Sequence, residues 1–443
     1  MLSETKRITF AVLSALVIAA STLAQSDASQ QNRTGKAGVF AIVGARIVTV
    51  SGATIESGTV VLRNGKIEFV GANVAVPAGA EKIDGKGLTV YPGMIDAATN
   101  MGLLEIQQGM PGGVDVSEVG VMNANAKAYL GVNPHSTHIN VTRVNGITTV
   151  LSFPTGGVIA GQATLINLNG STQAEMAVVP EYGLVINFPR VATGGGFGGP
   201  PVDFNEAVRR RDNQIEDLRK MFRNAENYLR ARDAYAKDKT LPYVATDLRN
   251  EAMAPYLRGA RPVLFTAERE RDIRAALKFA AEFKLKGAII GGQEAWKAAD
   301  ELKKANFGVI YTNIYNLPVR EDDAYDSLFE APSKMAAAGI RFCISTGNDG
   351  AEVRDLPYHA GLAGAFGLSR EEALKSVTLY PAQVLGVDDR LGSIDAGKIA
   401  NIVVTDGDLL DPRTNIKYLF INGRMLPLTS RHTDLFDSFK DRK

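Results

Sequence analysis

The segment TVYPGMIDAATNMG, residues 89–102, decides how the rest of this sequence is interpreted. Its apolar start leads to Pro92 and Gly93, which predict a sharp turn because proline presets φ and glycine accepts positive φ. The apolar residues 94–97 after the turn predict a short strand, and polar Asn100 predicts its end. We therefore expect this strand to begin an α/β region that continues along the chain.

Segments rich in β-branched residues bracket that α/β region. Residues 39–90 contain AIVGARIVTV and GTVVLRNGKIEFVG, in which the Asn64-Gly65 pair is a strong hairpin signal. Residues 400–428 contain ANIVVTDGD and IKYLFINGRML, with a similar Asn422-Gly423 pair. Two such segments predict one small sheet that is assembled from both chain ends.

Strand-like and helix-like segments alternate between these ends, which predicts parallel β/α units. Besides residues 94–97, the candidate strands are 147–153, 183–188, 262–265, 287–290, 308–312 and 340–345. Seven strands are one short of a closed eight-stranded barrel. Residues 241–256 are the candidate location of the eighth strand, although this segment has no pattern that assigns it.

An insertion interrupts the alternation. Residues 194–201, GGGFGGPP, are too rich in glycine and proline for regular structure and predict a mobile loop. Asp203 is a candidate N-cap for a following helix that reaches Lys237, because the apolar residues keep helical spacing and the opposite face is charged. This predicts a solvated helix on the exterior of the barrel. A substrate lid hinged at the glycines is the alternative.

The N-terminus has the pattern of a secretory signal peptide. Lys6 and Arg7 precede the apolar run 8–20, and small residues lead to a candidate cleavage site after Ala24. The run is short for a membrane span, and an uncleaved anchor is the alternative. We expect export to the periplasm or the exterior, with residues 25–38 as a flexible leader and no membrane association after cleavage.

Composition narrows the class of protein and of partner. The 443 residues are 45% hydrophobic and 22% charged, which is ordinary for a globular chain. A formal charge of +1 argues against a nucleic-acid partner. The single cysteine, Cys343, excludes an internal disulfide. We expect a small-molecule substrate or ligand, and assembly with itself or with another chain is left open.

The opening segment resembles the first barrel strand of the amidohydrolase superfamily, where Pro-Gly-x-Ile-Asp-x-His-x-His supplies two metal-binding histidines. The residues that match this frame are Pro92, Gly93, Ile95 and Asp96. The histidine positions carry Ala98 and Asn100. Near the C-terminus, GLSREEALKSVTLYPAQVLGV, RLGSIDAGK and IANIVVTDGDLL resemble the closing helix of the family and its return to the small sheet.

This resemblance implies a (β/α)8 TIM-type barrel with a small β-sandwich built from both chain ends. The barrel would span residues 91–390, the sandwich 39–90 and 391–430, and a tail 431–443. Resemblance to imidazolonepropionase-like members implies hydrolysis of a carbon–nitrogen bond other than a peptide bond, in a cyclic or linear amide. A catalytically inactive barrel that serves as a binding or partner protein is the alternative.

The family takes metal ligands from four strands, and this sequence lacks most of them. The resemblance aligns Thr266 with the fifth-strand histidine and Gly291 or Gly292 with the sixth, while Asp349 is displaced from the eighth-strand aspartate. The histidines of the chain lie elsewhere, at His135, His138, His359 and His432. Oxygen ligands alone suit harder ions than zinc. We expect no tightly bound zinc, and leave a divalent metal open in a reduced or relocated site.

Three of the four histidines, one carboxylate and a glycine-rich segment supply further candidate residues. His135 and His138 lie in a predicted helix, where i, i+3 spacing would put both rings on one face, either as part of a relocated metal site or as a polar surface. Asp349 and His359 are the catalytic candidates, although His359 could instead be a packed histidine. The candidate substrate-binding residues are Asn100, Gly156, Gly157 and Gln162. The last three belong to residues 154–170, which are glycine-rich and predict a loop over the barrel mouth.

Overall fold

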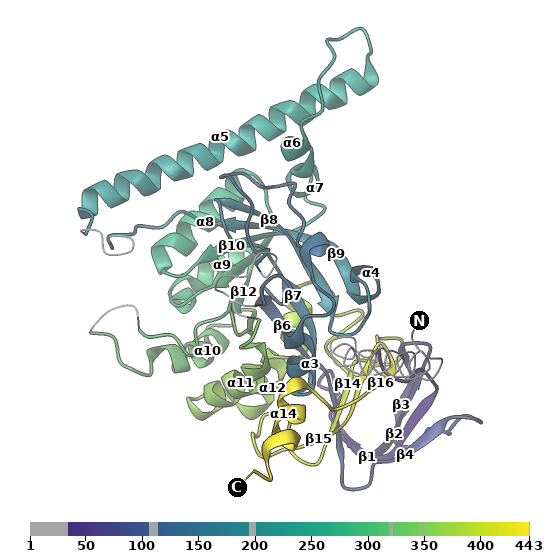
Figure 1. Ribbon diagram of the computed structural model, residues 1–443. Helices are drawn as coiled ribbons and strands as arrows, with labels where there is room; N and C mark the ends of the chain where they lie inside the picture. The colour runs from purple at the N-terminus through teal and green to yellow at the C-terminus, as the bar shows by residue number, and fades with distance from the viewer. Residues whose placement is uncertain (1–33, 106–113, 195–200, 319–321, 348–349, 443) are drawn as a thin grey trace, which may run out of the picture.

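The computed structural model describes residues 34–105, 114–194, 201–318, 322–347 and 350–442. Two eight-stranded sheets organise this part of the chain. Figure 1 shows their arrangement, with the helices around the barrel sheet. The candidate catalytic residue Asp349 and the glycine-rich residues 195–200 lie outside the described residues.

One of these two sheets combines strands from both ends of the chain, as predicted. The N-terminal half supplies β1 (Phe40–Ile47), β2 (Ile55–Arg63), β3 (Lys66–Gly71), β4 (Glu81–Asp84) and β5 (Thr89–Pro92). The C-terminal segment supplies β14 (Ile402–Thr405), β15 (Ile416–Ile421) and β16 (Arg424–Leu426). Antiparallel pairing of β14 with β5 joins the two contributions, with Val403 opposite Tyr91. The second sheet begins at Met94, two residues after β5 ends.

The second sheet forms a nearly closed barrel, and its strands follow one another in chain order. Its strands are β6 (Met94–Thr99), β7 (Ile147–Ser152), β8 (Ile159–Asn167), β9 (Ala177–Asn187), β10 (Val263–Ala267), β11 (Gly287–Gly291), β12 (Gly308–Tyr311) and β13 (Phe342–Ile344). All seven predicted strands are confirmed. They run parallel, whereas β8 is antiparallel to both of its neighbours.

The prediction for the eighth strand was wrong. Residues 241–256 contain no strand and instead form α6 (Leu248–Ala252) and most of α7 (Ala254–Leu257). The missing strand is β8, in the segment that was predicted to be a loop. All nine residues of β8 are buried, so its two faces lack the apolar–polar alternation of a half-exposed strand. Gly161 is needed there because a β-carbon would lie 2.9 Å from Ala126 O.

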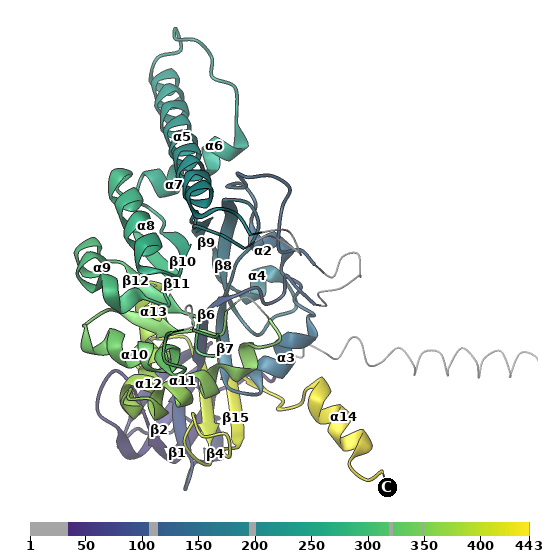
Figure 2. The same ribbon diagram turned by 90° about the vertical axis from the view of Figure 1, so that its left-hand side faces the viewer.

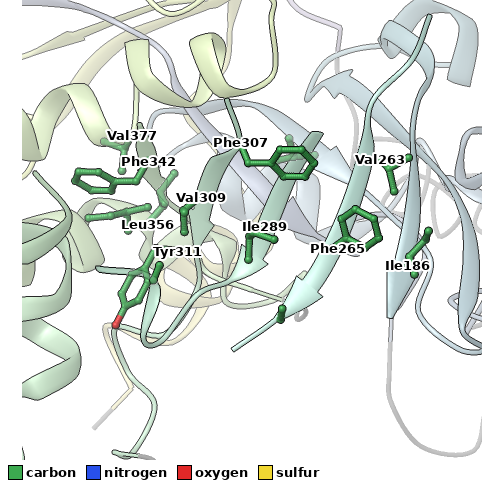
Figure 3. Packing of buried hydrophobic residues seen from close by; sticks show 14 of the residues in the cluster. Ile186, Val263, Phe265, Ile289, Phe307, Val309, Tyr311, Phe342, Leu356 and Val377 are labelled. Carbon is green, nitrogen blue, oxygen red and sulfur yellow. The ribbon is translucent and has the colours of Figure 1, made fainter. Parts of the chain in front are cut away.

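Side chains of alternating strand positions fill the barrel and cover it. Ile95, Leu264 and Ile290 belong to the cluster inside the sheet. Phe265 and Val309 belong to the larger cluster outside it, which packs against the helices (Figure 3). The helices of the second half are α8 (Glu270–Glu282), α9 (Ala299–Ala305), α10 (Ser327–Ala337), α11 (Leu356–Ala365), α12 (Arg370–Ser376) and α13 (Leu379–Val384).

Helix α5 (Phe204–Lys237) lies on the exterior of the barrel. The side chain of Asp203 caps it by accepting from Glu206 N at 3.1 Å, as predicted. Phe222 packs edge-on against Phe279 of α8, with ring centroids 5.0 Å apart. Beyond Ala225 the helix buries no residue, and Figure 2 shows this end projecting past the barrel. The described contacts therefore fit an exterior helix that docks on α8 and whose later part makes polar contacts with residues 244–258, among them Arg232 to Glu251 at 2.9 Å.

The remaining helices are short. They are α2 (Ala128–Gly131), α3 (Thr137–Arg143), α4 (Gln173–Met176), the 3-10 turns η3 (Ala295–Ala298) and η4 (Val353–Asp355), and α14 (Arg431–Phe439) near the C-terminus. Within the described ranges, no helix has the length and apolar character that a bilayer crossing requires.

Candidate active site

Polar side chains gather where β9, β10, β11 and β12 end, which is the end of a parallel barrel that carries reacting groups in enzymes of this architecture. We call them the mouth cluster. Its members are Asn187, Thr266, Glu268, Gln293 and Asn313. Two amide-centred bonds connect them across strands: Thr266 Oγ1 donates to Asn187 Oδ1 at 3.2 Å, and Gln293 Nε2 donates to Asn313 Oδ1 at 3.1 Å.

Glu268 is the acidic member of the mouth cluster. Its Oε2 accepts from Asn313 Nδ2 at 2.9 Å and from Gln293 N at 3.3 Å. Its Oε1 accepts no hydrogen bond from the described residues. Burial raises the pKa of Glu268, against the lowering effects of the bonds from Asn313 and Gln293 and of the Arg190 charge. A half-buried carboxylate is thus fixed through one oxygen and open at the other.

The carboxylate of Glu268 occupies space that a side chain on β11 would need. A β-carbon on Gly291 would lie 2.4 Å from Glu268 Oε1, and Gly291 has a φ of +102°. Both facts require glycine at this position, since the backbone conformation and the close approach each disfavour any side chain. Gly291, one of the two positions aligned with the sixth-strand histidine, therefore cannot present a ligand while Glu268 keeps its place.

A second carboxylate, Asp96, lies at the seam between β6 and β13, the two ends of the barrel sheet. Its Oδ1 accepts from Ala98 N at 3.0 Å, and its Oδ2 accepts from Thr346 N at 3.1 Å and Thr346 Oγ1 at 2.5 Å. Burial raises the pKa of Asp96 to about 6, against the lowering effect of these bonds. Each oxygen has a partner, so Asp96 joins the two edges and has little capacity left for a ligand.

Asn100 also holds the seam. Its Oδ1 accepts from Gly350 N at 3.0 Å, and the side chain is buried. The amide oxygen of this predicted substrate-binding residue is therefore engaged in tying the end of β6 to the residues after β13.

The other predicted substrate-binding residues pack mainly against residues 114–127. A β-carbon on Gly156 would lie 2.6 Å from the Cβ of Ser117. Gln162 is 3% exposed, and its Nε2 donates to Ala124 O at 2.9 Å. Gly157 alone reaches the mouth cluster, because its carbonyl accepts from Asn187 Nδ2 at 2.9 Å. The structure thus separates Gln162 and Gly156 from the cluster and links Gly157 to it through the backbone.

His359 lies in the first half of α11 and is 3% exposed. Its ring packs on Tyr315, with centroids 4.1 Å apart, and its Nδ1 has no hydrogen-bond partner among the described atoms. Burial lowers the pKa of His359 to about 4, so the ring is neutral near pH 7. These surroundings favour the packed histidine over the acid/base residue.

The predicted shared helix face of His135 and His138 was wrong. Helix α3 begins at Thr137, and Ser136 is its N-cap, accepting from His138 N at 3.3 Å. His135 therefore precedes the helix. The ring Nε2 of His138 lies 3.0 Å from Glu105 O. The side chain of Asn133 instead accepts from His135 N at 2.9 Å in a turn before the helix, and Ser136 provides the cap.

The described donor set does not fit the zinc that the family resemblance implies. Ala98 and Gly291 have no side-chain donor, and the hydroxyl of Thr266 is bonded to Asn187. Among the described residues, no three His, Cys, Asp or Glu side chains are grouped to hold one metal ion. Structural and catalytic zinc sites require nitrogen, thiolate or carboxylate ligands at three or four positions.

The mouth cluster was largely missed from the sequence. Only Thr266 was named, as an aligned position that lacks an imidazole. Glu268 follows β10 directly, and Asn313 stands two residues after β12. A polar residue just beyond a buried strand was the available signal. The histidine positions of the family frame give no indication of it, because none of the cluster's acidic or amide residues occupies them.

Comparison with known proteins identifies relatives over much of the chain. Residues 322–426 match the model of the Amidohydrolase family. Amidohydrolase tasK of Hapsidospora irregularis is 24% identical over 362 residues, which cover 76% of this chain and 36% of that protein. An N-acetylglucosamine-6-phosphate deacetylase of Haemophilus influenzae is 58% identical over 33 residues, 7% of this chain and 9% of that protein. The matched part of this chain thus covers about a third of the length of the first of these curated relatives and less than a tenth of the second.

Solved structures extend the similarity to the whole fold. An amidohydrolase from Thermotoga maritima MSB8 matches with a TM-score of 0.77 and 25% identity, covering 88% of this chain and 99% of that one. A putative prolidase from Bifidobacterium longum matches with a TM-score of 0.51 and 18% identity, covering 92% and 99%. The second likeness concerns the fold alone.

Proposed function

Because this chain belongs to the amidohydrolase superfamily of hydrolases, we propose that it hydrolyses a carbon–nitrogen bond other than a peptide bond, in a cyclic or linear amide. The observation that carries this proposal is the mouth cluster. It brings a carboxylate and several amide groups together at the strand ends where barrel enzymes bind their substrates. Fold alone would not carry it, because barrels of one fold host many functions.

The proposed hydrolase works with a reduced set of metal-binding groups and without tightly held zinc. When bound in a barrel mouth, a divalent metal lowers the pKa of water and polarises the substrate carbonyl. The chain's own residues provide other help: the backbone N–H of Gln293 and the side-chain amide of Asn313 orient Glu268, and the side chains of Gln293 and Asn313 offer polar atoms to a substrate. Apparent binding energies of structural zinc are about 10–16 kcal/mol, so loss of most nitrogen ligands should abolish tight binding.

Elemental analysis of the dialysed protein, paired with hydrolysis assays, tests this proposal. The assays would use five- and six-membered cyclic imides and linear N-acyl amides, with and without chelator. We expect zinc far below one ion per chain and hydrolysis that survives chelation. Near one zinc per chain, lost on Asp349→Ala, would contradict the reduced site. Zinc lost instead on His135→Ala or His138→Ala would indicate a relocated site.

A catalytically inactive binding barrel is the second candidate. It is favoured by Ala98 and Gly291, which offer no reactive side chain, and by Asp96 and Asn100, whose oxygens are engaged in the seam. Saturable binding of an amide without turnover, in the same assays, would select this candidate over the hydrolase.

A further inference from the structure

We propose that Glu268 is the acid–base residue of this barrel, using its free Oε1 to move the proton during amide hydrolysis. The inference rests on the proposed function and deepens it, because it assigns the chemistry to a named atom. The assignment uses no side chain at a position that the family uses for a metal ligand.

The backbone around Glu268 places its carboxylate firmly. Gly292 N donates to Ala267 O at 2.8 Å, and Glu294 N donates to Glu268 O at 3.0 Å, so β10 and β11 remain joined beyond their last paired residues. The two hydrogen bonds to Oε2 then fix the side chain. A reacting group must be held this way, since small displacements of a catalytic atom are costly.

The free oxygen lies above β11, on the side from which a side chain would project. The 2.4 Å distance between Oε1 and a β-carbon on Gly291 shows that glycine leaves this space to the carboxylate. A carboxylate needed only for structure would be expected to have both oxygens paired, as Asp96 has. Glu268 instead keeps an acceptor in the mouth of the barrel.

The surroundings suit proton transfer. Arg190 supplies a cationic charge that acts on Glu268, Asn313 and Gln293 supply neutral donors, and the charge of Glu268 in turn helps to raise the pKa of the Tyr311 phenol. Burial raises the pKa of Glu268 more than these groups lower it. A shift of that direction moves a carboxylate toward the pH at which a general base is most effective.

The proposed steps balance without a further reactant. Glu268 Oε1 accepts a proton from water as the water oxygen bonds to the amide carbonyl carbon, and the carbonyl π electrons move to its oxygen. The tetrahedral adduct collapses, the carbon–nitrogen bond breaks, and the protonated Glu268 gives its proton to the leaving nitrogen. The products are a carboxylic acid and an amine, and Glu268 is again a carboxylate.

The main test compares Glu268→Gln with Glu270→Gln in the full chain, on an amide that the wild-type protein hydrolyses. Glu270 is a matched control because it lies two residues away and pairs with Arg274 on the exterior at 3.0 Å. We expect Glu268→Gln to lower kcat by roughly 10²–10⁴-fold, the usual contribution of a general acid–base residue, and Glu270→Gln to leave it unchanged. Thermal melting confirms that both variants fold.

Two readouts separate chemistry from structure. Glu268→Gln should remove the acidic limb of the kcat profile against pH, and added formate should restore part of the activity of Glu268→Ala. Wild-type turnover that persists in Glu268→Gln overturns this inference while leaving the proposed function intact. A wild-type protein that binds amides and hydrolyses none of them overturns both.

Discussion

Two carboxylates of the same barrel sheet have opposite surroundings. Asp96 on β6 is fully buried, and both its oxygens accept hydrogen bonds. Glu268 after β10 is fixed through Oε2 alone. Burial raises the pKa of both groups. A raised pKa therefore marks a structural joint as readily as a reactive group, and the free oxygen distinguishes the two.

The difference follows from where the sheet is continuous. Between β10 and β11 the ladder is complete, with Thr266 opposite Ile290, so no side chain is needed to join these strands. Between β13 and β6 the connection includes Gly347 N to Ala98 O at 3.2 Å, and side chains supply further bonds. Buried backbone donors need partners, and Asp96 provides them at the seam.

Removing the seam carboxylate should have the largest effect. Asp96→Ala leaves the amides of Ala98 and Thr346 and the Thr346 hydroxyl without their acceptor. At about 1–3 kcal/mol for each buried unpaired group, we expect the free energy of unfolding to fall by about 4 kcal/mol. Chemical denaturation measures it, with Glu270→Gln as the control. A loss below about 1 kcal/mol would show that other contacts close the barrel.

The seam carboxylate should also make stability depend on pH. The pKa of Asp96 is about 6 in the folded chain and near 3.8 when unfolded, so the folded chain binds the proton more tightly. Tighter proton binding by folded Asp96 adds to the free energy of unfolding below about pH 4. This addition is lost as pH rises through about 6, so the free energy of unfolding falls by roughly 3 kcal/mol in total. Denaturation from pH 4 to 7 tests it against Asp96→Asn. Parallel curves for the two proteins would contradict it.

Adding a methyl group beside the mouth carboxylate should have a smaller effect. Gly291→Ala strains a backbone φ of +102° and forces the Glu268 carboxylate aside. We therefore expect the free energy of unfolding to fall by about 1–3 kcal/mol and kcat to decrease. A double-mutant cycle with Glu268→Ala isolates the contact. Additive losses in the cycle would mean that backbone strain alone is responsible.

The smallest effect is expected from Asn313→Ala. It removes one hydrogen bond from Oε2 of Glu268 and should cost about 1 kcal/mol of stability. Because that bond lowers the pKa of Glu268, its loss should move the acidic limb of the kcat profile to higher pH. An unchanged limb would indicate that Asn313 does not control the mouth carboxylate.

Strands with strong local patterns could be predicted from the sequence, whereas β8 could not. The runs that became β7 and β10–β13 are apolar and bounded by turn residues, as buried parallel strands require. Strand β8 contains Gly161, and glycine is depleted in strands because it has no side chain to pack. Strand β8 is buried because it pairs with β7 on one side and β9 on the other, and only the folded chain brings these strands together.

By itself, the sequence determined the alternation of strands and helices, the small sheet built from both ends, and the presence of Ala98 and Asn100 after the Ile95-Asp96 pair, because these follow from local patterns and residue identity. Only the tertiary structure decided which carboxylate is spent on closing the barrel and which keeps a free oxygen. The donors to Asp96 include Thr346, 250 residues away, and those to Glu268 come from the two following strand ends. The role of a buried charge depends on partners that meet only when the barrel closes.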